Sequence, residues 1–364
     1  MNFDLTEDEE MLKALAERFV TDRYDHEARA KYLAKENGFC PENWALMSEL
    51  GLVAAMFDAE NGGLGLGLTG LATIFEALGR GLVVEPLTES VVLAGGLFET
   101  LASDELKGQW MEALVMGEKR LAFAHREQAA RDNPSWVETR FEGGTLSGAK
   151  SLVAAGAGVD AYIVSARVAG AAGDADGIEL FLVEAGAAGL GVRPWRLVDG
   201  SLCVSLTLNK VECRRLGGSL ETILSAELRA MLVRTAEALG IMDRLFTETL
   251  DYLRTRKQFG VPLASFQALQ HRMVAQYSAL EQARSLLYLA IVAENGDKEA
   301  LKKAILGARA FIAEASVTLG HEMIQMHGGM GVTDELIIGH GHKRLLMLSR
   351  WPESPEATLD RFAA

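Results

Sequence analysis

Apolar residues in the first 120 positions recur every three or four residues, a spacing typical of helices that bury one face. Thr6 is followed three residues later by Glu9, which forms a capping box, so we expect the first helix over residues 7–24. Four more helices are predicted over residues 44–50, 71–78, 90–101 and 104–116. The pattern therefore predicts an N-terminal α-helical domain over residues 1–119.

From Leu121 onward the apolar residues fall in short alternating runs separated by glycines, as is typical of strands. Residues 201–211 alternate most regularly and predict a half-buried strand that closes the sheet. The inward residues of that strand would be Leu202, Val204, Leu206 and Leu208. We expect a middle β-domain, barrel-like or sandwich-like, over residues 120–215.

Beyond residue 220 the helical period returns in long segments joined by short polar or glycine-containing turns. The predicted helices span residues 221–256, 264–295, 298–326 and 335–349. Brief connections favour antiparallel neighbours, so we expect a C-terminal four-helix bundle over residues 216–364. The fold class is thus α+β, mainly α.

Charge and cysteine content narrow the class of protein. Asp and Glu number 50 against 36 Lys and Arg, and the net charge of −14 repels nucleic acids and anionic membrane surfaces. Three cysteines without CxxC spacing fit a reducing compartment. The acidic opening is unlike a secretory signal, and no apolar run approaches the roughly 18 residues that cross a bilayer. We expect a cytoplasmic protein without nucleic-acid partner or membrane insertion.

Gly65, Gly67 and Gly70 match G-x-G-x-x-G ahead of a predicted helix, and Glu85 follows at a distance suited to a ribose hydroxyl. The preceding residues 57–63 include carboxylates, which are badly placed beside a pyrophosphate, and no βαβ alternation follows. We therefore favour a glycine-rich interhelical loop. The alternative, a nicotinamide-dependent dehydrogenase, predicts a parallel sheet within the first hundred residues.

A basic motif, Arg254-Thr255-Arg256-Lys257-Gln258-Phe259-Gly260, lies where one long predicted helix ends and the next begins. Its cations can hold a phosphate through charge-assisted hydrogen bonds, while Phe259 and the downstream Gln267 add a flat apolar surface and an amide. The alternative is that these cations only complement a helix dipole, an effect of about 0.3–1 kcal/mol each.

A glycine motif, Gln325-Met326-His327-Gly328-Gly329-Met330-Gly331, ends another long predicted helix. Three glycines in four positions allow a tight turn or the close approach of a ligand to the backbone. An ordinary glycine-terminated helix is the alternative. The neighbouring histidines His327, His340 and His342 lack a carboxylate or cysteine at ligand spacing, so no metal site is predicted.

With helices, β-domain and bundle in this order, the two motifs make the chain resemble the acyl-CoA dehydrogenase family of flavoenzymes. Similar segments run nearly from end to end, over residues 3–7, 60–66, 76–80, 146–150, 177–183 and 189–192. The resemblance implies FAD-dependent α,β-dehydrogenation of an acyl-CoA, with hydride passing to flavin N5. It also implies electron-transfer flavoprotein or a similar acceptor. Because FAD sites are shared between subunits, it implies a homotetramer or a heterotetramer with a homologous subunit.

By this resemblance, Arg256, Phe259 and Gln267 would bind the diphosphate and adenine side of a neighbouring subunit's FAD. Gln325, Gly328 and Gly329 would line its adenosine part. The family's flavin-contacting Leu-Thr-Glu-Pro loop corresponds to residues around His125, where His125 and Arg126 replace the usual side chains. Any flavin contact of His125 would therefore be made by the backbone or be altered.

At the catalytic base the chain departs from the family pattern. Relatives use the Glu of an Ile-Tyr-Glu-Gly-Thr segment, and counting from Gly328 without gaps places Pro352 there. A one-residue shift makes Glu353 the candidate base, while the alternative family position falls on Ala230 and Met231. These departures favour the small-subunit type seen in pimeloyl-CoA and steroid side-chain dehydrogenases. A non-catalytic subunit that holds FAD or serves assembly, or a binding module without FAD, stays open as the alternative.

Overall fold

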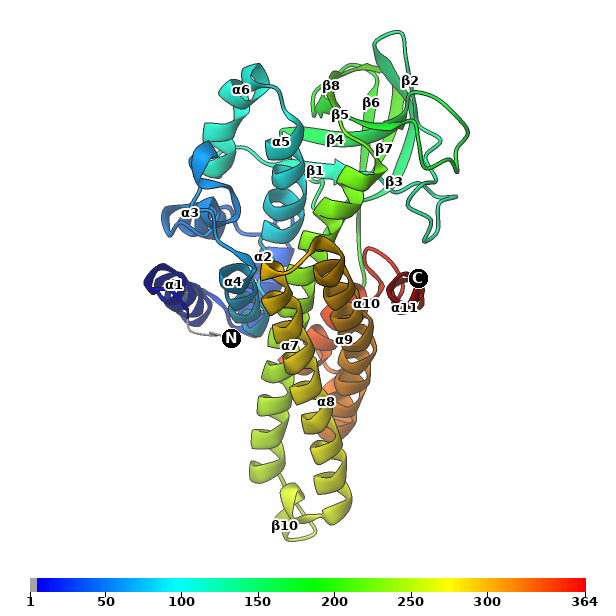
Figure 1. Cartoon of the computed structure of the whole chain (residues 1–364). Coiled ribbons are helices and arrows are strands. Elements are labelled where there is room, and N and C mark those ends of the chain that lie inside the picture. The colour runs from blue at the N-terminus through cyan, green and yellow to red at the C-terminus, as the bar shows by residue number, and fades with distance from the viewer. Residues whose placement is uncertain (1–4) are drawn as a thin grey trace. The chain divides into compact units, whose positions relative to one another are not determined.

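The computed structural model describes residues 5–364, except for the side chains of His26 and Asn295, so part of the matching segment 3–7 lies outside it. The chain forms two compact units (Figure 1). One contains the chain up to Lys31, Gly67–Val83 and Met231–Ala364; the other contains Tyr32–Leu66 and Val84–Ala230. The helical, β and helical order of elements confirms the predicted fold class. The division into three domains stays a prediction.

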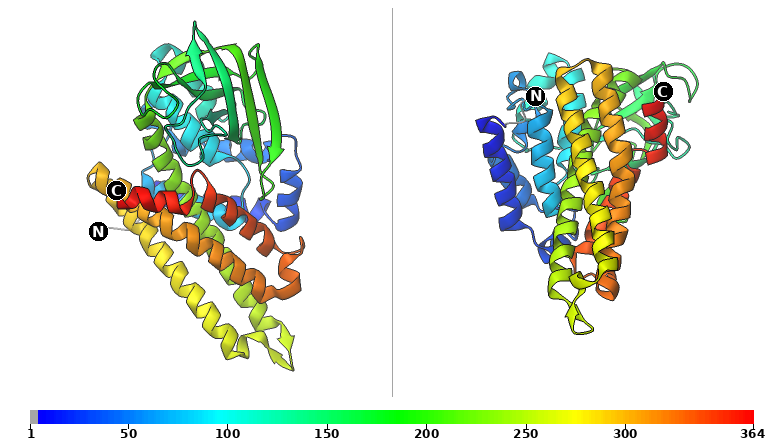
Figure 2. Two further views of the ribbon diagram at one scale, coloured as in Figure 1. Left: turned by 90° about the vertical axis from the view of Figure 1, so that its right-hand side faces the viewer. Right: turned by 60° about the horizontal axis from the view of Figure 1, so that its bottom comes forward.

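The first unit is built from long helices, of which α7, α8 and α9 run side by side (Figures 1 and 2). The periodicity located most of them to within a few residues, although helices α2 and α11 were not predicted. The helices that lie wholly or mostly in this unit are α1 (Glu7–Arg23), α2 (His26–Leu33), α4 (Leu68–Gly81), α7 (Leu220–Thr255), α8 (Gln267–Val292), α9 (Lys298–His327), α10 (Ile337–Arg350) and α11 (Pro355–Ala363).

Helices α4 and α7 cross at two copies of the same tetrapeptide, Glu-Ala-Leu-Gly, at residues 76–79 and 237–240. A Cβ on Gly79 would come within 3.0 Å of the Glu237 carbonyl oxygen, and one on Gly240 within 3.0 Å of the Glu76 carbonyl oxygen. Each glycine therefore packs directly on the backbone of the other helix. No other residue fits at either position without moving the two helices apart.

Beside this crossing, four charged side chains join three helices. Arg80 contacts Glu76 at 2.6 Å and Asp243 at 3.0 Å, while Arg284 contacts the same two carboxylates at 2.9 Å and 3.1 Å. Each cation thus bridges both acids, and all four side chains are partly buried, where charge pairs are screened less than at the surface. Arg284 belongs to α8, so the network links α4, α7 and α8.

The second unit combines helices with an eight-stranded sheet, seen edge-on in Figure 2. Its helical segments are α3 (Pro41–Glu49), the π-helix Leu87–Gly95, α5 (Gly96–Leu101) and α6 (Asp104–Val115). The strand order is β6 (Leu190–Arg196), β7 (Leu202–Glu212), β3 (Thr145–Ala154), β2 (Arg140–Glu142), β4 (Ala161–Arg167), β5 (Ile178–Glu184) and β8 (Arg214–Gly217), with β1 (Leu121–Ala124) beside β4.

Strand β7 corrects one expectation. Val204, Leu206 and Leu208 are buried as predicted, in a core that includes Tyr162 and Phe181. However, β7 pairs with both β3 and β6, so it lies one place in from the edge and does not close the sheet. The edge strand β6 escaped the analysis because its residues are mostly exposed and lack regular apolar alternation.

The glycine-rich stretch around Gly65 is an interhelical loop, and the dinucleotide-binding alternative is wrong. The described part of the chain has no strand before Leu121, so no βαβ unit surrounds these glycines. The N-terminus of α4 is already occupied, since both carboxylate oxygens of Glu294 lie 3.0 Å from the Leu68 amide nitrogen. Gly63 packs against the Phe57 carbonyl, which explains its small size without a ligand.

None of the helices in residues 5–364 combines the length and the apolar character needed to span a membrane.

The α4–α7 crossing leads to a stability prediction. Gly240→Ala should lower the free energy of unfolding by at least about 3 kcal/mol, because the added methyl group overlaps a backbone oxygen that cannot rotate away. Urea titration followed by circular dichroism measures the change. Gly108→Ala is the control: this exposed glycine inside α6 has open space around it, so alanine should stabilise by about 0.5–1 kcal/mol. Equal stabilities of the two variants would contradict the packing argument.

Candidate functional site

The basic motif and the glycine motif lie together within the first unit. Helix α7 ends at Thr255, just before the basic hairpin, and helix α9 ends at His327, just before the glycine turn. The rings of Tyr252 and His327 stack with centroids 4.3 Å apart and planes inclined by 26°. Two bends that are distant in sequence therefore meet at the same end of the helical bundle.

The basic motif forms a β-hairpin with a two-residue loop, visible at the lower end of the bundle in Figure 1. Strands β9 (Lys257–Gln258) and β10 (Val261–Pro262) flank Phe259 and Gly260, which have φ angles of +53° and +81°. Positive φ at both central residues is the type I′ geometry. It suits Gly260 but is unfavourable for Phe259, whose ring is 91% exposed. A strained, exposed aromatic residue at a hairpin tip points to a binding function.

The hairpin also presents unpaired positive charge. Arg254 contacts Asp251 at 3.5 Å, whereas Arg256 and Lys257 are exposed and form no ion pair with any described residue. Gln267, the first residue of α8, is exposed as well. Guanidinium and ammonium groups left free in this way can bind an anionic group such as a phosphate.

The three glycines of the glycine motif are present for different structural reasons. Gly331 packs against the Ile324 carbonyl oxygen, and Gly328 has a φ of +58°. At Gly329 the φ is unexceptional and a Cβ would meet no atom within 4 Å, so the fold itself would accept a side chain there. The bare backbone at Gly329, beside the exposed Gln325, leaves room for a ligand. Cationic hairpin and open turn together fit a phosphate-bearing nucleotide.

His125, in the second unit, follows strand β1 and directs its ring into the β-domain. Its Nδ1 lies 2.8 Å from Ser165 Oγ, and that oxygen accepts a hydrogen bond of 3.1 Å from Lys150 Nζ. Burial and the Lys150 charge lower the pKa of His125 to about 3, so the imidazole is neutral. Because Nδ1 is bonded inward, this nitrogen is not available for the predicted ligand contact.

Lys150 and Glu127 form a buried ion pair that the sequence analysis missed. Lys150 Nζ lies 2.7 Å from Glu127 Oε1 and is fully buried; burial lowers the pKa of Lys150 to about 8 against the opposing effect of Glu127. Burial alone would raise the pKa of Glu127, but the charge of Lys150 together with the hydrogen bonds from Lys150, Glu138 and Thr139 lowers that pKa overall. The Glu127 carboxylate also accepts hydrogen bonds from the backbone N–H groups of Glu138 and Thr139. These bonds hold the two ends of the loop over residues 128–137 together.

Arg167 organises the same region from strand β4. It is 1% exposed and donates only to backbone carbonyl oxygens. Its acceptors are Ser135, Val137, Ala169, Ala172, Asp174 and Asp176. One guanidinium therefore holds two neighbouring loops, residues 135–137 and 169–176, against the sheet.

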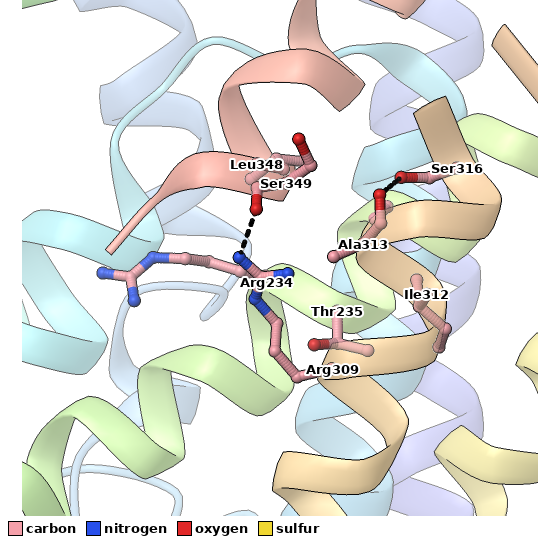
Figure 3. A pocket seen from close by; sticks show the side chains of 9 residues that line it. Arg234, Thr235, Arg309, Ile312, Ala313, Ser316, Leu348 and Ser349 are labelled. Carbon is pink, nitrogen blue, oxygen red and sulfur yellow. Dashed lines mark hydrogen bonds between the residues drawn. The ribbon is translucent and has the colours of Figure 1, made fainter. Parts of the chain in front are cut away.

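Glu353, the candidate base, is buried between α10 and α11 in the first unit. Its carboxylate lies 2.9 Å and 3.0 Å from Arg361 Nη1 and accepts a hydrogen bond of 2.9 Å from Thr358 Oγ1. Arg309 Nη2 donates to the carbonyl oxygen of Ser349 (Figure 3) and also to those of Trp351 and Glu353. The adjoining cavity has room for about one water molecule. The geometry thus favours an anchoring function for Glu353.

Sequence comparison identifies relatives along almost the whole chain. A model described as the acyl-CoA dehydrogenase N-terminal domain matches residues 6–118, and one described as the acyl-CoA dehydrogenase C-terminal domain matches residues 226–352. Acyl-CoA dehydrogenase FadE27 of Mycobacterium tuberculosis is 30% identical over 341 residues, covering 91% of this chain and 90% of FadE27. The 3-(aryl)acrylate reductase of Clostridium sporogenes is 29% identical, covering 90% and 89%.

Solved structures agree. The ChsE4-ChsE5 complex from Mycobacterium tuberculosis contains a chain with a TM-score of 0.90 and 27% identity, covering 100% of this chain and 98% of that one. The Tcur3481-Tcur3483 steroid ACAD gives a TM-score of 0.88 and 28% identity, covering 98% and 97%. These similarities confirm the resemblance inferred from the motifs.

The buried ion pair gives a prediction for the β-domain. Lys150→Met should lower the free energy of unfolding by about 3–5 kcal/mol, because it leaves the Glu127 carboxylate buried without its cation. Adding Glu127→Gln should recover part of the loss, so the double variant is more stable than the sum of the single effects predicts. Urea titration measures all three variants. Lys298→Met, at an exposed lysine, is the control, with a change within about 0.5 kcal/mol. Strict additivity would contradict a coupled pair.

Proposed function

Because the chain belongs to the acyl-CoA dehydrogenase family, we propose that it acts in FAD-dependent α,β-dehydrogenation of an acyl-CoA thioester as the FAD-holding subunit of an assembly with a homologous chain. The observation that supports this most directly is the meeting of the cationic hairpin and the open glycine turn at the Tyr252–His327 stack. A site of this composition suits the diphosphate and adenosine of FAD.

Different residues of the chain bind different parts of the cofactor. Arg256 neutralises the diphosphate, Phe259 covers an adenine-side surface, and Gln267 supplies an amide. Gln325, Gly328 and Gly329 line the adenosine part, where the missing side chains allow close approach. These residues serve a neighbouring subunit's FAD, and the backbone at His125, in the second unit, makes a separate flavin contact. When bound, the flavin supplies the acceptor for the hydride that leaves the acyl β-carbon.

The partner is a homologous chain that covers the exposed apolar surface around this site. On the first unit, the outward side of α8 exposes Val274, Tyr277, Tyr288 and Leu289, and the neighbouring hairpin exposes Phe259 and Val261. Scattered apolar residues are normal on a surface, but a group that continues along one helix into a binding hairpin indicates an interface. Two of the similar structures, ChsE4-ChsE5 and Tcur3481-Tcur3483, are named for a pair of chains.

The catalytic base is assigned by examining the two positions at which family members carry it, which are Glu353 and residues 230–231 in this chain. Removal of the α-proton requires a carboxylate that reaches the substrate to within about 3 Å. The Glu353 carboxylate is committed to Arg361 and Thr358, and the alternative family position holds the buried apolar residues Ala230 and Met231. We therefore assign the base to the homologous partner, and Glu353 as the base remains the competing hypothesis. A cytoplasmic location and electron-transfer flavoprotein as the acceptor complete the proposal.

The FAD site is tested by the pair Arg256→Ala and Arg254→Ala. Loss of the Arg256 guanidinium removes about 1.5–3 kcal/mol per charged hydrogen bond to phosphate, so FAD should bind about 10- to 100-fold more weakly. Arg254 lies two residues away but pairs with Asp251, so its variant should keep its flavin. Flavin content after gel filtration and titration with FAD measure both. A colourless wild-type assembly that takes up no FAD would instead favour the non-catalytic binding module.

The base is tested by Glu353→Gln in the loaded assembly. We expect the rate of flavin bleaching by acyl-CoA to stay within about twofold of wild type, because a base from the partner is untouched. The melting temperature should fall, because the amide no longer pairs with Arg361. Glu356→Gln, in an exposed pair with Arg350, is the control. Loss of bleaching in Glu353→Gln alone would restore Glu353 as the base.

A further inference from the structure

The two bends of the proposed FAD site are joined by one aromatic pair, Tyr252 and His327. Each ring belongs to the last helical turn before a bend. The Tyr252 carbonyl accepts the backbone N–H of Arg256 at 2.8 Å, and His327 directly precedes Gly328. A change in the distance or tilt between these rings would therefore move the hairpin relative to the glycine turn.

The orientation of the His327 ring is fixed by a hydrogen bond. Its Nδ1 lies 2.9 Å from the carbonyl oxygen of Met323, one helical turn earlier. A carbonyl oxygen can only accept, so the proton is on Nδ1. The ring is 6% exposed, and burial lowers its pKa, which keeps the imidazole neutral. A neutral ring held by its own helix presents one fixed face to Tyr252.

The first two residues of the glycine turn have little else to set their position. Neither Gly328 nor Gly329 has a neighbour within 4 Å of its Cβ position, whereas Gly331 lies against Ile324, His327 and Gly339. The hairpin is likewise exposed on most of its residues. The ring pair directly joins the two helical turns that precede the hairpin and the glycine turn.

We propose that Tyr252 and His327 are positioning residues that hold the hairpin and the glycine turn at the spacing that the cofactor requires, before the cofactor binds. This inference rests on the proposed function. It adds a function for two residues that need not touch the ligand. Aromatic pairs contribute about 0.5–1.5 kcal/mol, which corresponds to a two- to tenfold change in affinity if the stack is formed in the bound state.

The variants separate stacking from hydrogen bonding. Tyr252→Leu removes one ring but keeps apolar volume, and His327→Asn removes the other ring but keeps a donor for the Met323 carbonyl. Tyr252→Phe preserves the stack. His321→Asn is the matched control, because it removes an imidazole of the same helix whose ring contacts His342 and not Tyr252.

Hydrogen exchange of the chain without FAD is the first readout. Tyr252→Leu should speed amide exchange in residues 328–332, and His327→Asn should speed it in residues 257–263, each across the stack from the substitution. Tyr252→Phe and His321→Asn should exchange as wild type does. Unchanged exchange across the stack would overturn the inference, whether or not FAD binds.

The second readout is FAD affinity in the assembly, measured below the melting temperature of every variant. We expect Tyr252→Leu and His327→Asn to weaken binding two- to tenfold each, and the double variant to lose no more than the larger single effect, as a shared contact requires. Wild-type affinity in both single variants would overturn the inference while leaving the proposed function intact. Failure of the wild-type assembly to bind FAD would defeat the proposed function instead.

Discussion

The backbone contact between α4 and α7 at Gly79 and Gly240 is the constraint on which the first unit depends. Interhelical distances are set by the side chains at the contact, and glycine on both helices gives the closest approach. That approach brings Arg80, Asp243 and Arg284 within ion-pair distance. Because α7 is a single 36-residue helix, the crossing also fixes the line along which the distant Arg256 hairpin is presented.

Buried cations have a common use throughout the chain. Arg167 and Arg309 donate chiefly to backbone carbonyls, and Lys150 joins a carboxylate, a hydroxyl and a carbonyl. Carbonyl groups in irregular segments need donors when they are buried, and one guanidinium supplies five N–H groups in a rigid plane. Loops near the sheet and the segment after α10 are therefore shaped by single buried side chains. Substituting any of them would leave several acceptors unsatisfied at once.

The sequence predicted what local pattern determines. Periodicity located the long helices and the β-domain, and context correctly dismissed the Gly65 motif. It could not reveal which residues meet across the fold. Lys150 with Glu127, and Tyr252 with His327, are paired by tertiary packing that leaves no periodic signal. Glu353 illustrates the same limit. Counting along the chain selected its carboxylate as the candidate base, and only the structure shows that Arg361 pairs with it.

The exposed tip of the hairpin has a consequence for how the protein is made. Phe259 combines an unfavourable backbone conformation with an exposed aromatic ring. In the assembly proposed above, a copy synthesised in excess of its partner would keep this apolar tip uncovered and so tend toward aggregation or degradation. Production of the two chains in equal amounts, as from one shared transcript, would prevent this loss.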